Sequence, residues 1–478
     1  MIHPFSYLES STKIAPDAIA ISSVDSDMSY RELYDTALRF ARVFRDLGLK
    51  PGDVVAIHAQ PIVNLVVAQA LFHEACIGTE LPSDYDPNTN GLIDWIVVTK
   101  LIDGFDPQRQ IVLNNGFFNR VTLTQPIHDP IEYENEDSFL RINFSSGTTG
   151  VPKPMGVSIR CMFDRAVERR HQWRLDSPYL CLLGLAAGLT FMDYYAAIKE
   201  GETFLLTGHG KHVLEQIEHH KVKCVMGSPH QLAEMLRHAE NSNRDLASIT
   251  TVMSAGSVLP DAIAERINDL LNVRVVATYA SSEAGSTAIR DSLGSDKGYA
   301  GRLLDDVDVR IFDDQGNELP DGEIGLIAIK RAHQPQEYLG DSETTALAFK
   351  NGYFYPGDTG YLIGRDLYLA GRKAEIINAA GVKIDPARLD SVALEFPGII
   401  DAASFSSLDE FGLEAVGMFI VADKEIEKNK LYSFLVSKVG ESAPTIFALT
   451  KSIPRNHMGK VNRVDLADIY VSSLKTTE

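Results

Sequence analysis

The spacing of apolar and polar residues along this 478-residue chain predicts alternating helices and strands. Near the N-terminus an apolar stripe runs from Leu33 to Leu47 with the period of an amphipathic helix. Ser29 and Glu32 have the spacing of a capping box at the start of this helix. Gly48 follows the stripe and is typical of a residue that ends a helix. We expect one well-defined helix here.

Apolar runs further along the chain predict shorter strands and helices. Val54 to Ile57 predicts a buried strand, and Pro61 to Phe72 predicts another helix. Further on, strands and helices alternate, which favours a parallel sheet with helices on both faces. The predicted strands are 222–226, 249–253 and 273–277, and the predicted helices are 231–238 and 261–271.

Two regions have a different texture. Residues 78–135 are harder to assign, because 78–86 is loop-like and the short strands at 95–98 and 111–113 have little helix between them. From Val307 onward, short strands and turns predict a small β-rich subdomain, and a mixed segment of α and β character follows Arg372. We therefore predict an α/β protein with a large N-terminal domain, residues 1–371, and a small α+β C-terminal domain, residues 372–478.

Composition and charge narrow the classes of function. The net charge of −20 disfavours a nucleic-acid partner and an anionic membrane surface. The longest uncharged apolar run, Tyr179 to Met192, is roughly 14 residues and too short to span a bilayer. The first residues lack the basic and apolar segments of a signal peptide. We expect a soluble, cytoplasmic protein without a membrane span.

The segment 141–154 carries the strongest candidate chemistry. An apolar run that ends at Phe144 breaks into small hydroxyl residues and glycines, and Lys153 follows. Such a loop suits an anion, because glycines admit backbone N–H groups and hydroxyls donate further hydrogen bonds. It is not the common nucleotide loop, in which lysine directly follows the second glycine. The residues alone leave a phosphate cradle and a flexible turn equally open.

This order of residues, Ser-Ser-Gly-Thr-Thr-Gly-x-Pro-Lys, resembles the phosphate loop of the acyl-adenylate-forming, or AMP-binding, superfamily. That superfamily contains acyl- and aryl-CoA synthetases, stand-alone and peptide-synthetase adenylation domains, and luciferases. Further segments resemble its other motifs in the same order along the chain. These segments are 254–257, 279–283, 353–360, 369–386 and 453–463.

The resemblance implies a role for each matching residue. ATP phosphates are expected on Ser145, Ser146, Gly147, Thr148, Thr149, Gly150 and Lys153, with Ser282 nearby. Adenine is expected beside Ala255, Gly256 and Tyr279, and ribose beside Asp358 and Arg372. Glu283 is the implied Mg²⁺ ligand, Gly381 borders the implied pantetheine entry, and Lys460 is the implied catalytic lysine, acting with Thr148 and Glu283.

The acid-binding pocket is expected at Leu185, Ser257 and Ala280. Amino-acid-activating relatives place an aspartate within the stretch that here is 188–192, and this chain has none. A free α-amino acid is therefore disfavoured, and an apolar pocket favours an aryl or aliphatic acid without charge at its far end. Leu185 replaces the usual gate residue, Ala280 replaces a glycine, and Ala374 replaces the Asp or Lys of the expected hinge at 372–374.

Three functions remain open at this stage. The first is an enzyme that uses ATP and Mg²⁺ to activate a carboxylic acid as an acyl-adenylate and then transfers the acyl group to CoA. The second is a stand-alone adenylating enzyme that loads the phosphopantetheine of a carrier protein. The third and least favoured is a catalytically silent nucleotide-binding regulator. The histidines at 73 and 219–220 fit no metal motif, and structural or solvent-facing roles are expected for them.

Overall fold

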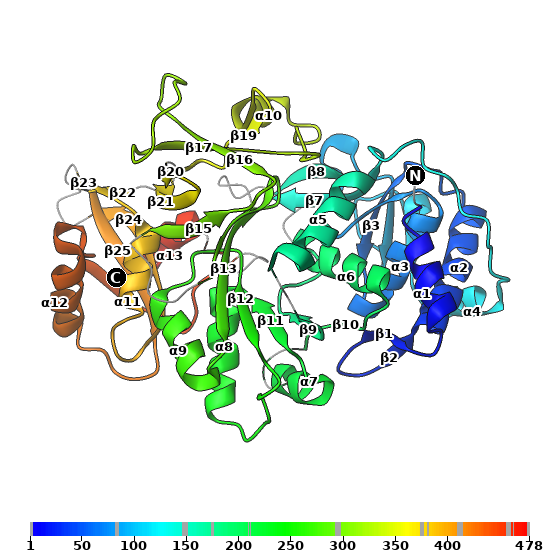
Figure 1. Cartoon of the computed structure of the whole chain (residues 1–478), viewed down its shortest axis with the longest axis horizontal. Coiled ribbons are helices and arrows are strands. Elements are labelled where there is room, and N and C mark those ends of the chain that lie inside the picture. The colour runs from blue at the N-terminus through cyan, green and yellow to red at the C-terminus, as the bar shows by residue number, and fades with distance from the viewer. Residues whose placement is uncertain are drawn as a thin grey trace.

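The computed structural model describes residues 3–81, 86–145, 152–173, 176–208, 210, 212–291, 298–372, 377–379, 382–408, 414–455, 460–461 and 463–475. Its N-terminal and central parts form two large sheets, and a smaller group of strands lies near the C-terminus. In Figure 1 the N-terminus is on the right and the C-terminal part is on the left. None of the helices in the described ranges combines the length and apolar character needed to cross a bilayer.

The predicted N-terminal helix is confirmed as α2 (Tyr30–Leu47). The Ser29 hydroxyl accepts a hydrogen bond from the Glu32 backbone N–H, and the Glu32 carboxylate accepts one from the Ser29 backbone N–H. Gly48 ends the helix with a φ of 94°, a left-handed conformation that favours glycine. Helix α1 (Ser6–Ile14), which the pattern did not reveal, packs against α2.

The first sheet has the order β6-β5-β3-β4-β7-β8 and is parallel except for β8. The strands predicted at 54–57 and 95–98 are confirmed, and β6 begins one residue before the predicted start. Helix α4 was not predicted. The strands are β3 (Val54–His58), β4 (Ile77–Thr79), β5 (Trp95–Val98), β6 (Gln110–Val112), β7 (Phe139–Ser145) and β8 (Lys153–Ser158), and the helices are α3 (Pro61–His73), α4 (Asn115–Leu123), α5 (Ile159–Trp173) and α6 (Gly188–Glu200).

The second sheet begins as the predicted parallel sheet. Val225, Val252 and Val275 lie side by side on three neighbouring strands and are buried between the helical layers. Its strands are β1 (Ile19–Ser22), β2 (Asp27–Ser29), β9 (Tyr179–Cys181), β10 (Phe204–Leu205), β11 (Cys224–Gly227), β12 (Thr251–Ser254) and β13 (Arg274–Ser281), and its helices are α7 (His212–His220), α8 (Pro229–Glu240) and α9 (Asp261–Leu271).

The same sheet continues as an antiparallel, β-rich part, as the texture after Val307 predicted. Strand β13 does not end at residue 277 but extends to Ser281, because β14 pairs with its second half. Tyr279 and Ala280 therefore lie within a strand, at a bulge, beyond the predicted strand end. The elements are β14 (Gly285–Arg290), β15 (Tyr299–Leu303), β16 (Val307–Phe312), β17 (Gly325–Arg331), β18 (Phe349–Lys350), β19 (Tyr353–Phe354), β20 (Asp358–Ile363), β21 (Asp366–Arg372) and α10 (Ser342–Ala348).

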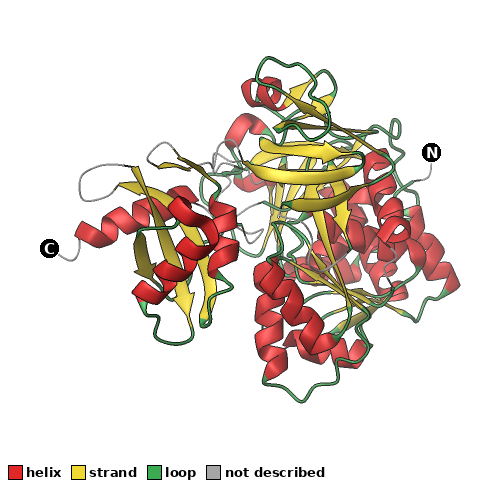
Figure 2. Cartoon of the chain, turned by 60° about the vertical axis from the view of Figure 1, so that its left-hand side comes forward, coloured by secondary structure: helices red, strands yellow, loops and turns green. Residues whose placement is uncertain are grey.

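The C-terminal part has its own sheets and its own buried apolar clusters. In Figure 2 it forms a separate group of strands and helices beside the rest of the chain. The rings of Phe405 and Phe419 lie 5.2 Å apart on neighbouring strands, tilted by 33°, and Leu466 is buried with them. The elements of this part are β22 (Ile377–Ala379), β23 (Val382–Ile384), β24 (Ile399–Leu408), β25 (Glu414–Ala422), β26 (Ile446–Leu449), α11 (Pro386–Ala393), α12 (Lys428–Val439), α13 (Arg463–Lys475) and a short 3-10 helix at 440–442. Two further 3-10 helices, at 89–91 and 107–109, belong to the N-terminal part.

Candidate active site

The candidate phosphate loop connects two paired strands of the first sheet. Strand β7 ends at Ser145, and β8 begins at Lys153, which is its direct partner across the ladder. The ladder therefore holds these two residues side by side at the base of the loop. Five predicted loop residues lie outside the described ranges: Ser146, Gly147, Thr148, Thr149 and Gly150.

Glu283 lies close to this loop base although it comes from the second sheet. The Tyr338 hydroxyl donates a 2.7 Å hydrogen bond to Glu283 Oε1. The Lys153 ammonium lies 5.4 Å from the centre of the Tyr338 ring, and the Leu339 N–H donates to the Pro154 carbonyl at 2.8 Å. Burial, together with the Glu283 carboxylate, raises the pKa of Tyr338. Tyr338 thus connects the predicted metal ligand with the strand that follows the phosphate loop.

A second carboxylate, Asp358, is the centre of a three-residue cluster. The Tyr279 hydroxyl donates to Asp358 Oδ2 at 2.5 Å, and Arg372 Nε donates to Oδ1 at 2.7 Å. Burial of the hydroxyl and the adjacent Asp358 charge raise the pKa of Tyr279. Strand β20 begins at Asp358, and β21, whose last residue is Arg372, pairs with it directly. The structure therefore brings the predicted adenine and ribose residues together.

The loop after β12 lies beside these residues, because β12 and β13 are neighbours in the sheet. Ala255 is buried, and its N–H donates to the Gly227 carbonyl at 3.0 Å. Gly256 has a φ of 95°, which a residue with a side chain rarely adopts. Ser257 is exposed, and Ala280 is partly exposed at the bulge of β13. All four residues thus lie at or near the carboxyl ends of parallel strands, where open α/β sheets bind ligands.

Leu185, from the predicted acid pocket, is buried, and the sequence pattern did not reveal what fixes it. Arg141 on β7 donates to the Leu185 carbonyl at 3.1 Å and to Asn143 Oδ1 at 3.0 Å. Its guanidinium also lies 4.0 Å from the centre of the Phe191 ring on α6. The Arg141 side chain therefore holds the loop before α6 by binding a backbone carbonyl of that loop.

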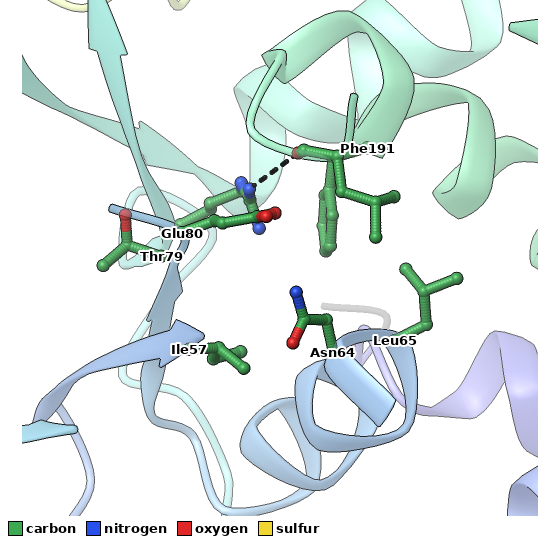
Figure 3. A pocket seen from close by; sticks show the side chains of 8 residues that line it. Ile57, Asn64, Leu65, Thr79, Glu80 and Phe191 are labelled. Atoms are coloured by element: carbon green, nitrogen blue, oxygen red, sulfur yellow. Dashed lines mark hydrogen bonds between the residues drawn. The ribbon is translucent and has the colours of Figure 1, made fainter. Parts of the chain in front are cut away.

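Beside Arg141 lies a cavity of about 10 Å³, large enough for one water molecule. In Figure 3, Glu80 and Thr79 approach it from the first sheet, Asn64 from α3 and Phe191 from α6. Burial raises the pKa of Glu80, and the charge of Arg141 opposes that change. Burial also lowers the pKa of Arg141 to about 10. Leu185 also lines this pocket, so polar and apolar side chains meet beside the loop before α6.

Lys460 comes from the C-terminal part of the chain, and Gly381 lies outside the described ranges. An isolated bridge pairs Arg455 with Val461, the residue after Lys460. Arg455 donates to Asp401 at 2.6 Å, and Asp401 lies 3.7 Å from His230 at the start of α8. Asp401 thus connects Arg455, the bridge partner of Val461, with the first turn of α8. Its predicted approach to the reacting centre stays a prediction.

The donor set at Glu283 suits a cation that arrives with a polyphosphate. The described residues contain no group of three or more His, Cys, Asp or Glu side chains that could hold a metal ion by themselves. Mg²⁺ bound to phosphates commonly takes only one or two protein carboxylates. A single buried carboxylate near Lys153 fits that arrangement, so Glu283 can serve as the protein ligand of a phosphate-bound Mg²⁺.

The chain thus combines two large α/β sheets, a phosphate-loop motif between β7 and β8, and two buried carboxylates. A family model described as "AMP-binding enzyme" matches residues 8–70 and 94–339, more than half of the chain. The chain belongs to this family of AMP-binding enzymes. Within it, the chain is an enzyme of the acyl- and aryl-CoA-synthetase-like ligase type.

Similar proteins span nearly the whole chain. It is 24% identical to a 2-succinylbenzoate–CoA ligase of Bacillus velezensis over 97% of each chain. It is 24% identical to a fatty acid–[acyl-carrier-protein] ligase of Streptomyces coeruleorubidus, covering 95% of this chain and 94% of that protein. The solved O-succinylbenzoate CoA synthetase of Bacillus subtilis in complex with ATP and magnesium has a TM-score of 0.79 at 21% identity, covering 96% of this chain and 98% of that one. This structural likeness confirms the fold.

Proposed function

We propose that the protein activates a carboxylic acid with ATP and then transfers the acyl group to the thiol of CoA. The observation that carries this proposal is the placement of two buried carboxylates, Glu283 and Asp358, around the carboxyl ends of the sheet next to the phosphate-loop strand. On this proposal, Glu283 would hold a phosphate-bound cation and Asp358 would bind a ribose. A pyrophosphate-releasing ligase needs both.

In the first half-reaction, a carboxylate oxygen of the acid attacks the α-phosphorus of ATP. A new P–O bond forms, the bond to the β-phosphate oxygen breaks, and pyrophosphate leaves. Lys153 and the adjoining loop residues would hold the leaving phosphates, and Lys460 would lie between the two negative groups that meet. A fixed ammonium there stabilises the transition state more than the ground state. Glu283 would hold Mg²⁺, which supplies charge neutralisation on the phosphates.

On this proposal, Asp358 exchanges hydrogen-bond partners when a nucleotide binds. Both of its oxygens already accept hydrogen bonds, from Tyr279 and from Arg372. A ribose can replace one or both donors, because its two neighbouring hydroxyls offer two similar hydrogen bonds. Arg372, which is only half-buried, would then turn part of its guanidinium toward the ribose or a phosphate. On this proposal the cluster keeps Asp358 paired until the nucleotide arrives.

In the second half-reaction, a thiolate attacks the acyl carbonyl, the C–O bond to AMP breaks, and a thioester forms. We propose that residues 372–478 rotate as a unit against residues 1–371, which withdraws Lys460 and admits the thiol. The separate apolar clusters of the C-terminal part support such a rigid unit. The proposed hinge includes Ala374, which lies outside the described residues. Hinge motions of this kind can limit turnover.

The acid that best fits is aryl or aliphatic and uncharged at its far end. Leu185 offers an apolar wall, and the nearby charge of Arg141 is directed at the Leu185 backbone carbonyl. The acceptor is proposed as CoA, since a CoA ligase is among the relatives that match the whole chain. A carrier protein's phosphopantetheine is the alternative, favoured by the relative that acts on an acyl-carrier protein.

Two assays test this proposal. Incorporation of labelled pyrophosphate into ATP, measured across a panel of aryl and aliphatic acids, should depend on the acid. If no acid supports the exchange while ATP still binds, the protein is a nucleotide-binding regulator and the proposal is wrong.

The acceptor is tested with the acid that gives the fastest exchange. AMP formation should require CoA and give an acyl-CoA. Formation of AMP only with a pantetheinylated carrier protein would replace CoA by the alternative acceptor.

A further inference from the structure

Arg165 is a buried arginine that no motif of the sequence singled out. It lies on α5, the helix that follows the phosphate-loop strands, and its side chain reaches the end of β13. One guanidinium nitrogen donates to the Ser282 carbonyl at 3.0 Å, and the other donates to the Glu283 carbonyl at 2.5 Å. Only 6% of its surface is exposed. Burying a charged guanidinium costs free energy unless hydrogen bonds or ion pairs compensate for the lost water.

The two contacts fix the backbone on both sides of the Glu283 side chain. A guanidinium presents its N–H groups in a planar, rigid fork, so two consecutive carbonyls bound by one fork cannot rotate independently. The Ser281 hydroxyl adds a third restraint by accepting a 3.0 Å hydrogen bond from the Ala284 N–H. Arg165 and Ser281 therefore restrain the backbone of the turn, while Tyr338 restrains the Glu283 carboxylate itself.

The residue after this turn leaves space for the arginine. Gly285 has a φ of 71°, and a Cβ added there would lie 3.3 Å from Arg165 Nε and 3.1 Å from an Arg331 guanidinium nitrogen. A side chain at position 285 would press on both arginines. Arg331 itself donates to the Ser286 carbonyl and pairs with Asp306, and these contacts support the following strand.

We propose that Arg165 is a positioning residue that holds Glu283 in the orientation required for a Mg²⁺ ion bound to ATP. This inference rests on the nucleotide site of the proposed function. Both of its hydrogen bonds go to backbone carbonyls, so it orients the carboxylate without forming an ion pair with it among the described residues. Residues that orient metal ligands in this way commonly contribute about 10- to 100-fold to metal affinity.

The experiment compares ATP binding with and without Mg²⁺ by titration calorimetry, in the absence of any acid. The ratio of the two dissociation constants measures how strongly Mg²⁺ and ATP are coupled in the site. In Arg165→Met this ratio should fall by about 10- to 100-fold, while the Mg²⁺-free affinity stays within about twofold. Arg165→Lys keeps the charge but loses the fork, so it should fall between wild type and Arg165→Met.

The matched control is Arg331→Lys, which changes the other arginine beside Gly285 and should keep the wild-type ratio. Thermal unfolding of each variant establishes that it is folded before binding is measured, and Arg165→Lys serves if Arg165→Met is not. An unchanged ratio in a folded Arg165 variant would overturn the proposal, as would an equal loss in Arg331→Lys. Because no acid is present, failure of acid activation would leave this test intact.

Discussion

Asp358 and Glu283 are two carboxylates with almost the same burial and opposite surroundings. They are 7% and 6% exposed. Asp358 accepts from a cation, Arg372, and from a phenol, whereas Glu283 accepts from a neutral phenol and has no ion pair among the described residues. A buried carboxylate without a cation favours the arrival of one. On our proposal, this difference lets Asp358 exchange hydrogen bonds with a ribose and lets Glu283 bind a cation.

The largest effect is expected from Asp358→Asn. This change keeps the shape but leaves Arg372 without its carboxylate and weakens the acceptor offered to a ribose. We expect kcat/KM for ATP in pyrophosphate exchange to fall by about 10²- to 10³-fold, since truncating one partner of such a pair costs about 2–5 kcal/mol. The control is Asp366→Asn, which removes a carboxylate that accepts from Tyr299 at 3.1 Å on the neighbouring strand. Equal losses in the two variants would remove the special role of Asp358.

Glu283→Gln should weaken the binding of Mg²⁺ without lowering the stability of the fold. The amide can still accept from Tyr338, but its charge is gone, so the Mg²⁺ concentration for half-maximal exchange should rise by about 10- to 100-fold. The melting temperature should stay the same or rise, because an unpaired buried charge is removed. A variant that melts well below wild type and keeps its Mg²⁺ dependence would show that Glu283 is structural.

A smaller effect is expected from Tyr338→Phe. The substitution removes one hydrogen bond to the Glu283 carboxylate and keeps the ring beside Lys153. We expect exchange activity at limiting Mg²⁺ to fall by about twofold to tenfold, in line with the modest net value of one hydrogen bond. Tyr353→Phe, which removes an exposed tyrosine hydroxyl bound to Asp308, is the control and should leave the activity unchanged.

No effect on exchange is expected from Glu74→Gln, although Glu74 is a buried carboxylate with an arginine partner, like Asp358. Burial by itself would raise the pKa of Glu74, but hydrogen bonds from His73 and Arg45 outweigh it, and the pKa is lowered. A carboxyl with a lowered pKa in the folded state stabilises the fold above its unfolded pKa, and this stability is lost as pH falls through the folded value.

The measurement for Glu74 is urea unfolding at several pH values. Wild type should lose stability as pH falls below about 4.5, and Glu74→Gln should lose less over that window. At pH 7 the variant should be less stable by about 1–3 kcal/mol. A parallel decline of both proteins with pH would mean that another group governs the loss of stability.

Local patterns were enough to predict much of the fold. The capping box at Ser29 and the helix over 261–271 are encoded by residues a few positions apart, and both are confirmed. The extension of β13 to Ser281 was missed because it depends on pairing with β14, and an apolar run cannot reveal a partner strand. Helix α4 was missed because only Val121 among its residues is buried, which leaves a weak apolar stripe.

The residues of the candidate site also divide into those that local motifs predicted and those that depend on long-range contacts. Glu283 and Asp358 were found because they lie within short motifs that resemble those of a known family. Tyr338, Arg165 and Arg141 were not, because each acts through a residue far away in the sequence. Tyr338 and Arg165 reach Glu283 across 55 and 118 positions, and Arg141 reaches Leu185 across 44. Contacts of this length depend on the assembled sheets.

The central claim is that two half-reactions share one site and that Lys460 serves only the first. The most direct test is Lys460→Ala, measured separately as acid-dependent pyrophosphate exchange and as thioester formation from a pre-made acyl-adenylate. We predict that the exchange is lost while thioester formation is largely kept, because the second step needs no ammonium at the α-phosphorus. Equal loss of both half-reactions in the folded variant would contradict the account.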